Sequence, residues 1–479
     1  MYNVLSFMRE EDIVAIIHQP FLFTWRDVEA TSELDRFLLV TDSIPDAEMI
    51  QELKRRRGKG RNDYPVIAMW NAILAGIVFE HPSMASLLRE LRRNAELREL
   101  CGFDPMLGSA AVPDEHNISR FLGNVIELES LIHRMFHGLV EELADVVPDF
   151  GRHLSFDGKA VPSYSTGQKS KQTGKTSDPD ADYGHKSYRG VSKDGKPWET
   201  VKKWFGYQLH LIVDSDYELP VAYEVMKAST SEVTRLVPMV AALAEKQPVV
   251  AKRARELAAD RGLDSGEVNR VLLREHGIRP IIDNRTLWKQ EKHEGGRDPE
   301  QPITRALYPQ RVDSVVYTER GDIRCVCPAS GEERAMAFTG YEADRESIKY
   351  RCPAAACGFE CVGKSQCCQM APGTPGAFGR IVRIPLEQDR RIFVPTPRTS
   401  PSFKRSYAKR TSVERVNSRI DNVLGFEHHT IRGLKKMRAR MGLALVVMLA
   451  MAVGRIRVGQ PEHLRSIVRR VEPDWREAA

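Results

Sequence analysis

One acidic residue stands among bases near the end of the chain, in "SYAKRTSVERVNSRIDN" (406–422). Tyr407, Arg410, Glu414 and Asp421 are spaced by three, four and seven residues, so they share one face if the segment is helical. A carboxylate can bind a metal cation, and a guanidinium beside it can bind a phosphate. The segment therefore predicts a surface that holds a cation next to a polyanion.

Two aspartates accompany predicted strands: Asp157 lies in "HLSFDGKAV" and Asp260 ends "ELAAD". Acidic residues disfavour strands, so each one needs a reason. Each could begin a turn, because "DGK" and "DRG" are common turn sequences. Alternatively, several carboxylates could meet at the end of a sheet and bind two Mg²⁺ ions. A turn explains either aspartate alone better, but the combination with Glu414 favours the metal site.

Seven of the eight cysteines lie between residues 325 and 368. This density predicts a tetrahedral zinc site that stabilises a small subdomain. The expected ligands are Cys325, Cys352, Cys357 and Cys361. The alternative is a set of reduced thiols without a metal, and the irregular spacing does not decide between the two.

The elements that must position these residues divide the chain into five parts. Apolar residues at helical spacing are followed by strands alternating with helices, which predicts an α/β fold with a mixed sheet. An irregular stretch rich in Cys, Pro and Gly then predicts an inserted subdomain before the α/β pattern resumes. A helical part spans residues 1–150 and an α/β part spans residues 151–285. A Cys-rich insertion at 286–395 is followed by a second α/β part at 396–460 and a polar tail at 461–479.

Three segments carry more specific expectations. A long amphipathic helix is expected from Asn117, its predicted N-cap, to about residue 143. Residues 165–200 read as a polar loop. The apolar run 441–453 is shorter than the roughly 20 residues that cross a bilayer, so it predicts a buried core helix.

The charge distribution indicates a polyanionic partner. The 479 residues carry a net charge of only +6, but residues 401–479 contain seventeen Lys or Arg against seven Asp or Glu. The basic surplus therefore lies in the C-terminal part, where it can form one electropositive face. The N-terminus lacks the layout of a signal peptide, so we expect a cytoplasmic protein.

The motifs, taken in order and spacing, resemble the catalytic blocks of bacterial insertion-sequence transposases of the DDE type. The blocks are "SFDGKAV", "WFGYQLHLIVDSDYELPVAYEV", "AADRGLDSGEV" and "YAKRTSVERVNSRID". The last block is most similar to the group with a Tyr-Arg-Glu-Lys signature, although Asp421 stands where that group has Lys. The helical N-terminal stretch also resembles the domain that precedes the catalytic core in these proteins.

The resemblance implies a ribonuclease H-like (retroviral-integrase-like) catalytic core preceded by an all-α domain that binds DNA ends. It implies that Asp157, Asp260 and Glu414 are the catalytic residues and bind two Mg²⁺ ions, with Mn²⁺ as a substitute. The implied reaction is cleavage of DNA at the element's ends followed by strand transfer.

The implied partners are the element's terminal inverted repeats and target DNA, both double-stranded, bound by a homodimer without any membrane. The expected DNA-binding residues are Tyr407, Lys409, Arg410, Arg415 and Arg419. The loop 165–200 either contacts DNA as well or is a solvated loop.

Two alternative functions stay open at the level of sequence. A catalytically impaired remnant would bind element ends without cutting them, and Asp421 favours this reading while the intact acids oppose it. A Mg²⁺-dependent nuclease would cut without joining. Sequence does not separate cutting from joining, because the same carboxylates serve both reactions.

Overall fold

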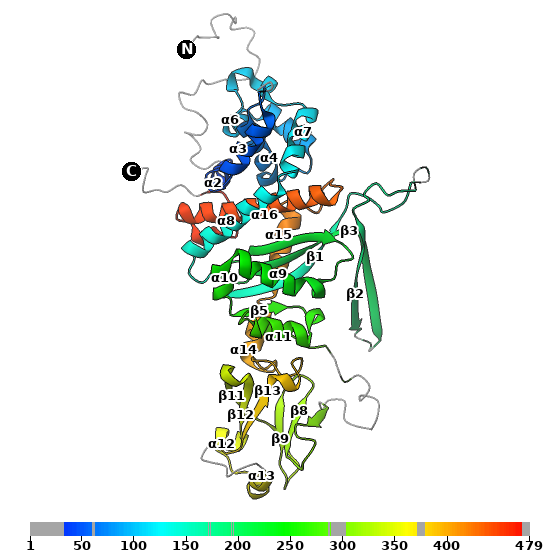
Figure 1. Ribbon diagram of the computed structural model, residues 1–479, viewed down its shortest axis with the longest axis vertical. Coiled ribbons are helices and arrows are strands. Elements are labelled where there is room, and N and C mark those ends of the chain that lie inside the picture. Colours follow the sequence, from blue (N-terminus) through cyan, green and yellow to red (C-terminus); the bar gives the residue numbers. More distant parts are fainter. Residues whose placement is uncertain are drawn as a thin grey trace, which may run out of the picture.

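A computed structural model describes residues 33–471, except 60–62, 171, 173, 193, 195, 286–287, 289–302 and 371–378. Parts of the expected N-terminal domain, Cys-rich insertion and tail thus lie outside the described residues. Helices occupy one end of the molecule, a mixed sheet lies in the middle, and two small sheets occupy the other end (Figure 1).

The central sheet has the order β2-β3-β1-β5-β6, with β4 also paired to β3. Strand β3 runs antiparallel to its neighbours β1, β2 and β4, whereas β5 runs parallel to β1 and β6. This arrangement confirms the predicted mixed α/β fold. The strands are β1 (His153–Pro162), β2 (Asp182–Val191), β3 (Pro197–Asp214), β4 (Leu219–Lys227), β5 (Glu256–Ala259) and β6 (Arg279–Ile282).

Helices cover both faces of this sheet (Figure 1). On one face, α9 (Glu232–Lys246) contacts β1 and β4, and α11 (Gly266–Arg274) contacts β6. On the other face, α14 (Pro401–Ala408) contacts β5 and β6, and α15 (Thr411–Asn422) contacts β1 and β3. A short helix, α10 (Pro248–Arg253), follows α9. Cover on both faces explains why the second half of β3 is buried along its whole length.

The C-terminal helix forms the junction between the sheet and the helical domain. Helix α16 (Leu434–Arg457) contacts β4 on one side and α2, α4, α7 and α8 on the other. It is long and apolar enough to span a membrane, but 89% of its most apolar window is buried in the fold, as the run 441–453 predicted. Residues 461–471 were expected in a polar tail, but Leu464 and Ile467 are buried in the main core.

The N-terminal part is helical, as predicted, but one expected helix is two. Instead of a single helix capped by Asn117, α7 and α8 meet at Glu127–Leu128, and α7 has Asp114 as its N-cap. The separate axes let α7 pack on α5 while α8 packs along α16. The helices are α2 (Asp35–Thr41), α3 (Ala47–Arg57), α4 (Val66–Val78), α5 (Met84–Arg93), α6 (Ala95–Cys101), α7 (Glu115–Ile126) and α8 (Glu129–Val146).

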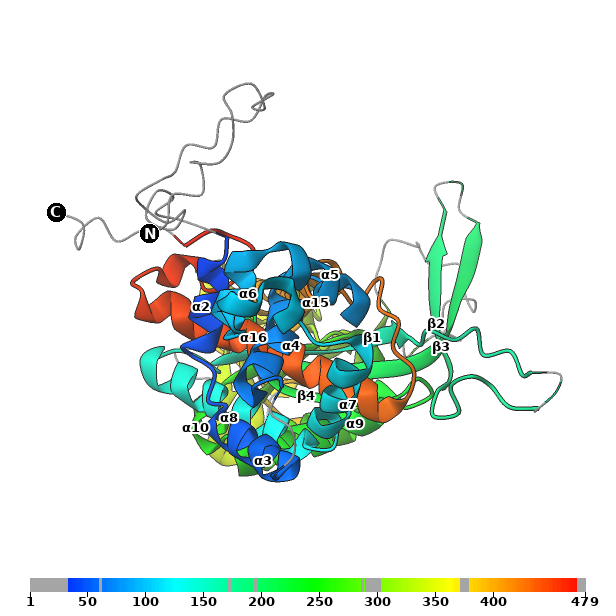
Figure 2. The same cartoon turned by 90° about the horizontal axis from the view of Figure 1, so that it is seen from above.

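Much of the expected loop 165–200 is instead a β-hairpin. Strand β2 is the edge strand of the central sheet and pairs with the first half of β3, and this hairpin projects from the body of the protein (Figure 2). Two cross-strand pairs, Gly184 with Trp204 and Gly190 with Trp198, place each indole where a glycine Cβ would stand. The glycines and lysines resemble loop composition, but the aromatic pairs stabilise the hairpin.

The Cys-containing part follows β6 and has its own core. It contains two antiparallel sheets of orders β10-β9-β8-β7 and β11-β12-β13, whose inner side chains form a hydrophobic cluster separate from the main core. The strands are β7 (Thr304–Ala306), β8 (Val315–Thr318), β9 (Ile323–Val326), β10 (Glu333–Ala335), β11 (Ala337–Glu342), β12 (Ser347–Arg351) and β13 (Ile381–Pro385). Two short helices, α12 (Pro353–Cys357) and α13 (Lys364–Met370), lie at its far end (Figure 1).

Candidate active site

The two aspartates predicted from the strands lie side by side in the sheet. In the parallel pair of β1 and β5, Phe156 is opposite Ala259, so Asp157 and Asp260 are the next residues at the same level. Asp157 continues β1, whereas Asp260 leaves β5 and begins a short 3-10 turn. The register therefore brings together two carboxylates that are far apart in the sequence.

Burial shapes the charge of Asp157. Its neighbour Gly158 faces Glu232 of α9, so the alternation of strand side chains turns Asp157 toward α15 on the opposite face. Burial raises the pKa of Asp157 to about 6, against the opposing influence of Lys186 and Arg410. A buried carboxylate of this kind requires a nearby cation to remain ionised.

The third acid approaches the aspartates from α15. Glu414 is about half exposed, and its Oε1 lies 2.9 Å from Nη2 of Arg410. The charges of Glu414, Asp260 and Asp157 all raise the pKa of Arg410, against the lowering effect of its burial. Arg410 is therefore the cation that the three predicted acids share.

The donor chemistry suits divalent cations, but the carboxylates do not form a ready-made metal site. The three carboxylates whose charges act on Arg410 supply the oxygen ligands that Mg²⁺ prefers. Among the residues that the structure describes, however, no group of three or more His, Cys, Asp or Glu side chains is arranged to hold a metal ion. Glu414 would have to exchange Arg410 for the metal.

The segment 406–422 is not the single helix that its spacing suggested. Helix α14 ends at Ala408 and α15 begins at Thr411, whose hydroxyl donates to the Ala408 carbonyl at 3.0 Å and so interrupts the backbone ladder. Tyr407 therefore belongs to α14, where its ring stacks on Phe403 with centroids 5.7 Å apart.

Asp421, which departs from the expected signature, has a partner on β1. Its carboxylate accepts a hydrogen bond from the ammonium of Lys159, two residues beyond Asp157 on the same strand face. The Lys159 side chain is only 11% exposed and that of Asp421 is 34% exposed. This ion pair links α15 to β1, the strand that carries Asp157.

Like Arg410, the other three bases expected to bind DNA have carboxylate partners within the protein. Lys409 Nζ lies 2.7 Å from Oδ1 of Asp216, and Arg415 Nε lies 2.8 Å from Oε1 of Glu218. Arg419 donates to the Glu218 carbonyl at 2.6 Å, and burial lowers the pKa of its guanidinium to about 10. These contacts give the three bases a structural role, and DNA binding by them stays a prediction.

The acceptors of these bases are residues that the sequence reasoning missed. Asp214, Asp216 and Glu218 occupy alternate positions where β3 turns into β4. The Asp214 carboxylate accepts hydrogen bonds from backbone N–H groups, including those of Gly151 and Tyr217. The acids that pair with the bases are Asp216 and Glu218. Three acids in five residues between two apolar strands were the available signal. The unusual segment 406–422 is thus explained in part by an acidic turn that packs against it.

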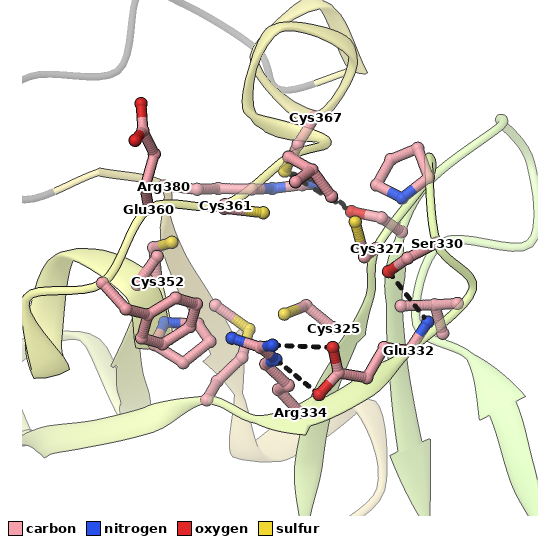
Figure 3. A pocket seen from close by; sticks show the side chains of 18 residues that line it. Cys325, Cys327, Ser330, Glu332, Arg334, Cys352, Glu360, Cys361, Cys367 and Arg380 are labelled. Carbon is pink, nitrogen blue, oxygen red and sulfur yellow. Dashed lines mark hydrogen bonds and ion pairs between the residues drawn. The ribbon is translucent and has the colours of Figure 1, made fainter.

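Five of the seven clustered cysteines line one cavity of about 190 Å³ in the Cys-containing part. Their thiols surround the cavity in Figure 3, at Cys325, Cys327, Cys352, Cys361 and Cys367. Three of the four predicted zinc ligands are among them.

The fourth predicted zinc ligand, Cys357, does not line this cavity and has an exposed side chain. Cys357 is the last residue of α12, whereas Cys352, which lines the cavity, is the N-cap of the same helix.

Comparison with known proteins matches most of the chain to transposase families. A family model described as "Transposase DDE domain" matches residues 148–450, and a second, "Transposase domain (DUF772)", matches residues 26–124. No curated protein matches the chain. Among solved structures, a cryo-EM structure of the piggyBac transposase synaptic complex with hairpin DNA matches at 11% identity and a TM-score of 0.34, over 91% of this chain and 79% of that chain.

Proposed function

Because the chain belongs to the insertion-sequence DDE transposases, we propose that it cleaves DNA at the ends of an insertion sequence and joins them to target DNA. The observation that carries this proposal is the strand register that puts Asp157 beside Asp260, on a strand that α15 contacts, with Glu414 of α15 paired to Arg410.

The catalytic core is ribonuclease H-like in this proposal. Its support is the strand order β4-β3-β1-β5-β6, in which three antiparallel strands are followed by two parallel ones. The Cys-rich part is an insertion between β6 and α14, because the core elements resume after it. These assignments make residues 151–285 and 396–460 two parts of one domain.

Asp157, Asp260 and Glu414 are the residues that would hold two divalent cations, Mg²⁺ or Mn²⁺. When bound, such ions activate the attacking hydroxyl or water and stabilise the leaving oxygen in phosphoryl transfer. Asp157 is the natural shared ligand, because it lies between Asp260 on the neighbouring strand and the helix that carries Glu414.

Arg410 and Tyr407 would hold the DNA backbone once Glu414 has turned to the metal. The guanidinium already lies within electrostatic reach of all three acids, so a phosphate bound there is close to the reacting centre. The helical N-terminal domain would bind the element's ends, two copies of the chain would bring two ends together, and the protein would act in the cytoplasm.

The test is cleavage and joining of labelled element ends by the purified protein with Mg²⁺. We expect Asp157→Asn, Asp260→Asn and Glu414→Gln each to reduce cleavage by about 1,000-fold or more, since metal coordination supplies several kcal/mol to the transition state. DNA binding without metal should persist in all three. Asp149→Asn is the matched control, because this exposed carboxylate pairs with Arg152 outside the site.

Each other outcome has a definite meaning. Cleavage that persists in Asp157→Asn would refute the site assignment. Wild-type cleavage without joined products would indicate a nuclease, and DNA binding without cleavage would indicate an impaired remnant. Asp421, which favoured the remnant, has a partner in Lys159, so a role within the fold also explains the residue at this position.

A further inference from the structure

The cavity lined by five thiols is not explained by transposition. It lies between the two small sheets, where Cys325 and Cys327 come from the end of β9, Cys352 follows β12, Cys361 lies in a turn and Cys367 belongs to α13. The thiols face one another across the cavity in Figure 3. Four chain segments thus bring sulfur atoms to one place.

The segment that carries the later cysteines has little apolar packing to hold it. None of the residues 353–370 belongs to the hydrophobic cluster of this part, and α13 has no buried residue. Even so, both helices contribute to the wall of the cavity, α12 with Pro353 and Ala354 and α13 with Cys367. Small units without an adequate core are commonly stabilised by disulfides, a metal or oligomerisation. All eight cysteines are free thiols, so the clustered ones are available as metal ligands.

Two of the thiols lie close together in polar surroundings. Cys327 Sγ accepts hydrogen bonds from the Ser330 side chain and from the backbone N–H groups of Ser330 and Ala329, and Cys361 is hydrogen-bonded to Cys327.

Cys367 is occupied elsewhere. Its Sγ lies 3.6 Å from Ser314 Oγ and 3.8 Å from Arg380 Nη1. Ser314 and Arg380 are both buried, and Arg380 is held by Asp313, with both of its carboxylate oxygens 2.6 Å from Nη2. Cys367 therefore has partners on the wall of the cavity.

We propose that this cavity binds one structural Zn²⁺ ion through the thiolates of Cys325, Cys327, Cys352 and Cys361. In this set Cys327 replaces Cys357, which the sequence had predicted as a ligand. As they stand, the described thiols line the wall and no three of them are arranged to hold an ion. Zn–S bonds of about 2.3 Å would draw them inward and tie β9 to the segment 353–370.

The test is the metal content of the full-length protein, purified under reducing conditions without chelator and measured by mass spectrometry. We expect about one zinc per chain in the wild type, and a loss of at least fivefold in Cys325→Ser, Cys327→Ser and Cys361→Ser. The matched controls, Cys357→Ser and Cys367→Ser, should keep the metal. Cobalt replacement should give the visible spectrum of a tetrahedral tetrathiolate.

A second measurement avoids variants that fail to fold. Removing zinc from the intact wild type with a chelator should speed tryptic cleavage after Lys364 in α13, and adding zinc should reverse this. The zinc site would be refuted if the wild type contained no bound zinc. It would also be refuted if the chelator did not change the rate of cleavage after Lys364. Loss of zinc in Cys367→Ser together with retention in Cys325→Ser would overturn the ligand set. None of these readouts depends on DNA cleavage.

Discussion

Replacing Asp421 by lysine tests whether the Lys159–Asp421 pair positions α15, the helix that carries Glu414. In the wild type, the Lys159 side chain is 11% exposed and its ammonium is bonded to the Asp421 carboxylate. Asp421→Lys would place a second ammonium beside the first in a site with little access to water. The reciprocal exchange, Lys159→Asp with Asp421→Lys, restores opposite charges with the same pair of groups.

The expected loss of stability follows from the burial of the pair. Breaking a fully buried ion pair costs about 3–5 kcal/mol, whereas an exposed pair contributes less than about 1 kcal/mol. With one partner mostly buried and the other one-third exposed, we expect Asp421→Lys to lower the free energy of unfolding by about 2–3 kcal/mol. The double exchange should recover most of this loss.

The catalytic effect should be larger than the loss of stability suggests. Glu414 lies on the same helix as Asp421, two turns away, so a loosened α15 displaces the Glu414 carboxylate relative to Asp157. A displacement of about 1 Å at a reacting centre can cost about 100-fold in rate. We therefore expect cleavage to fall about 100-fold in Asp421→Lys and to return in the double exchange.

The assay combines urea unfolding with cleavage of labelled element ends in Mg²⁺, both at a temperature where all variants are folded. Ser418→Lys is a control for an added lysine on α15, because Ser418 is exposed and its hydroxyl accepts a hydrogen bond from Asn422 of the same helix. If Asp421→Lys keeps its stability and binds DNA more tightly, residue 421 faces DNA and the positioning role is refuted. A double exchange that stays as unstable as the single variant would also refute it.

Two further predictions concern charges near the sheet. Arg410→Gln removes the cation whose charge acts on all three carboxylates, so Mg²⁺ should raise the melting temperature of this variant more than that of the wild type. The control variant Arg152→Gln should behave as the wild type. An equal rise in all three proteins would contradict the position assigned to Arg410. His210 is buried and has no hydrogen-bond partner among the residues that the structure describes, and burial lowers its pKa from 6.5 to about 4. The unfolded chain therefore binds the extra proton first, and stability is lost as the pH falls from 6.5 toward 4, by up to about 1.4 kcal/mol per pH unit. His210→Phe, which keeps the stacking on Phe156, should reduce this loss in pH-dependent unfolding, unlike the exposed His116→Phe; an unchanged slope would show that His210 does not titrate there.

The regular elements of this protein could be predicted because their signals are local. Strand β1, strand β5 and helix α16 each carry their apolar pattern within their own residues, and the structure has them where the pattern indicated. Two features were not predicted, because they involve contacts that the apolar pattern of a single segment does not show. The division between α14 and α15 depends on a side-chain hydrogen bond of Thr411, and the β2–β3 hairpin depends on tryptophans that lie over glycines of the opposite strand.

The candidate site could be predicted only in part. The types and order of Asp157, Asp260 and Glu414 pointed to one site, and the parallel register then put the two aspartates at the same level. The partners of the surrounding bases could not be foreseen. Lys409 and Arg415 meet the acidic turn between β3 and β4 about two hundred residues earlier in the chain, and no periodicity encodes such a contact.

The amino-acid sequence by itself determined which chemical groups are present and which segments become helices and strands, because these depend on neighbouring residues. The tertiary structure decided which charges are neutralised and which thiols share a cavity. Lys159 and Asp421 form an ion pair, and Cys327 rather than Cys357 faces the cavity, only because packing brings distant segments together and excludes water between them. Burial and partner identity are properties of the assembled fold, and they give the same residue types different roles.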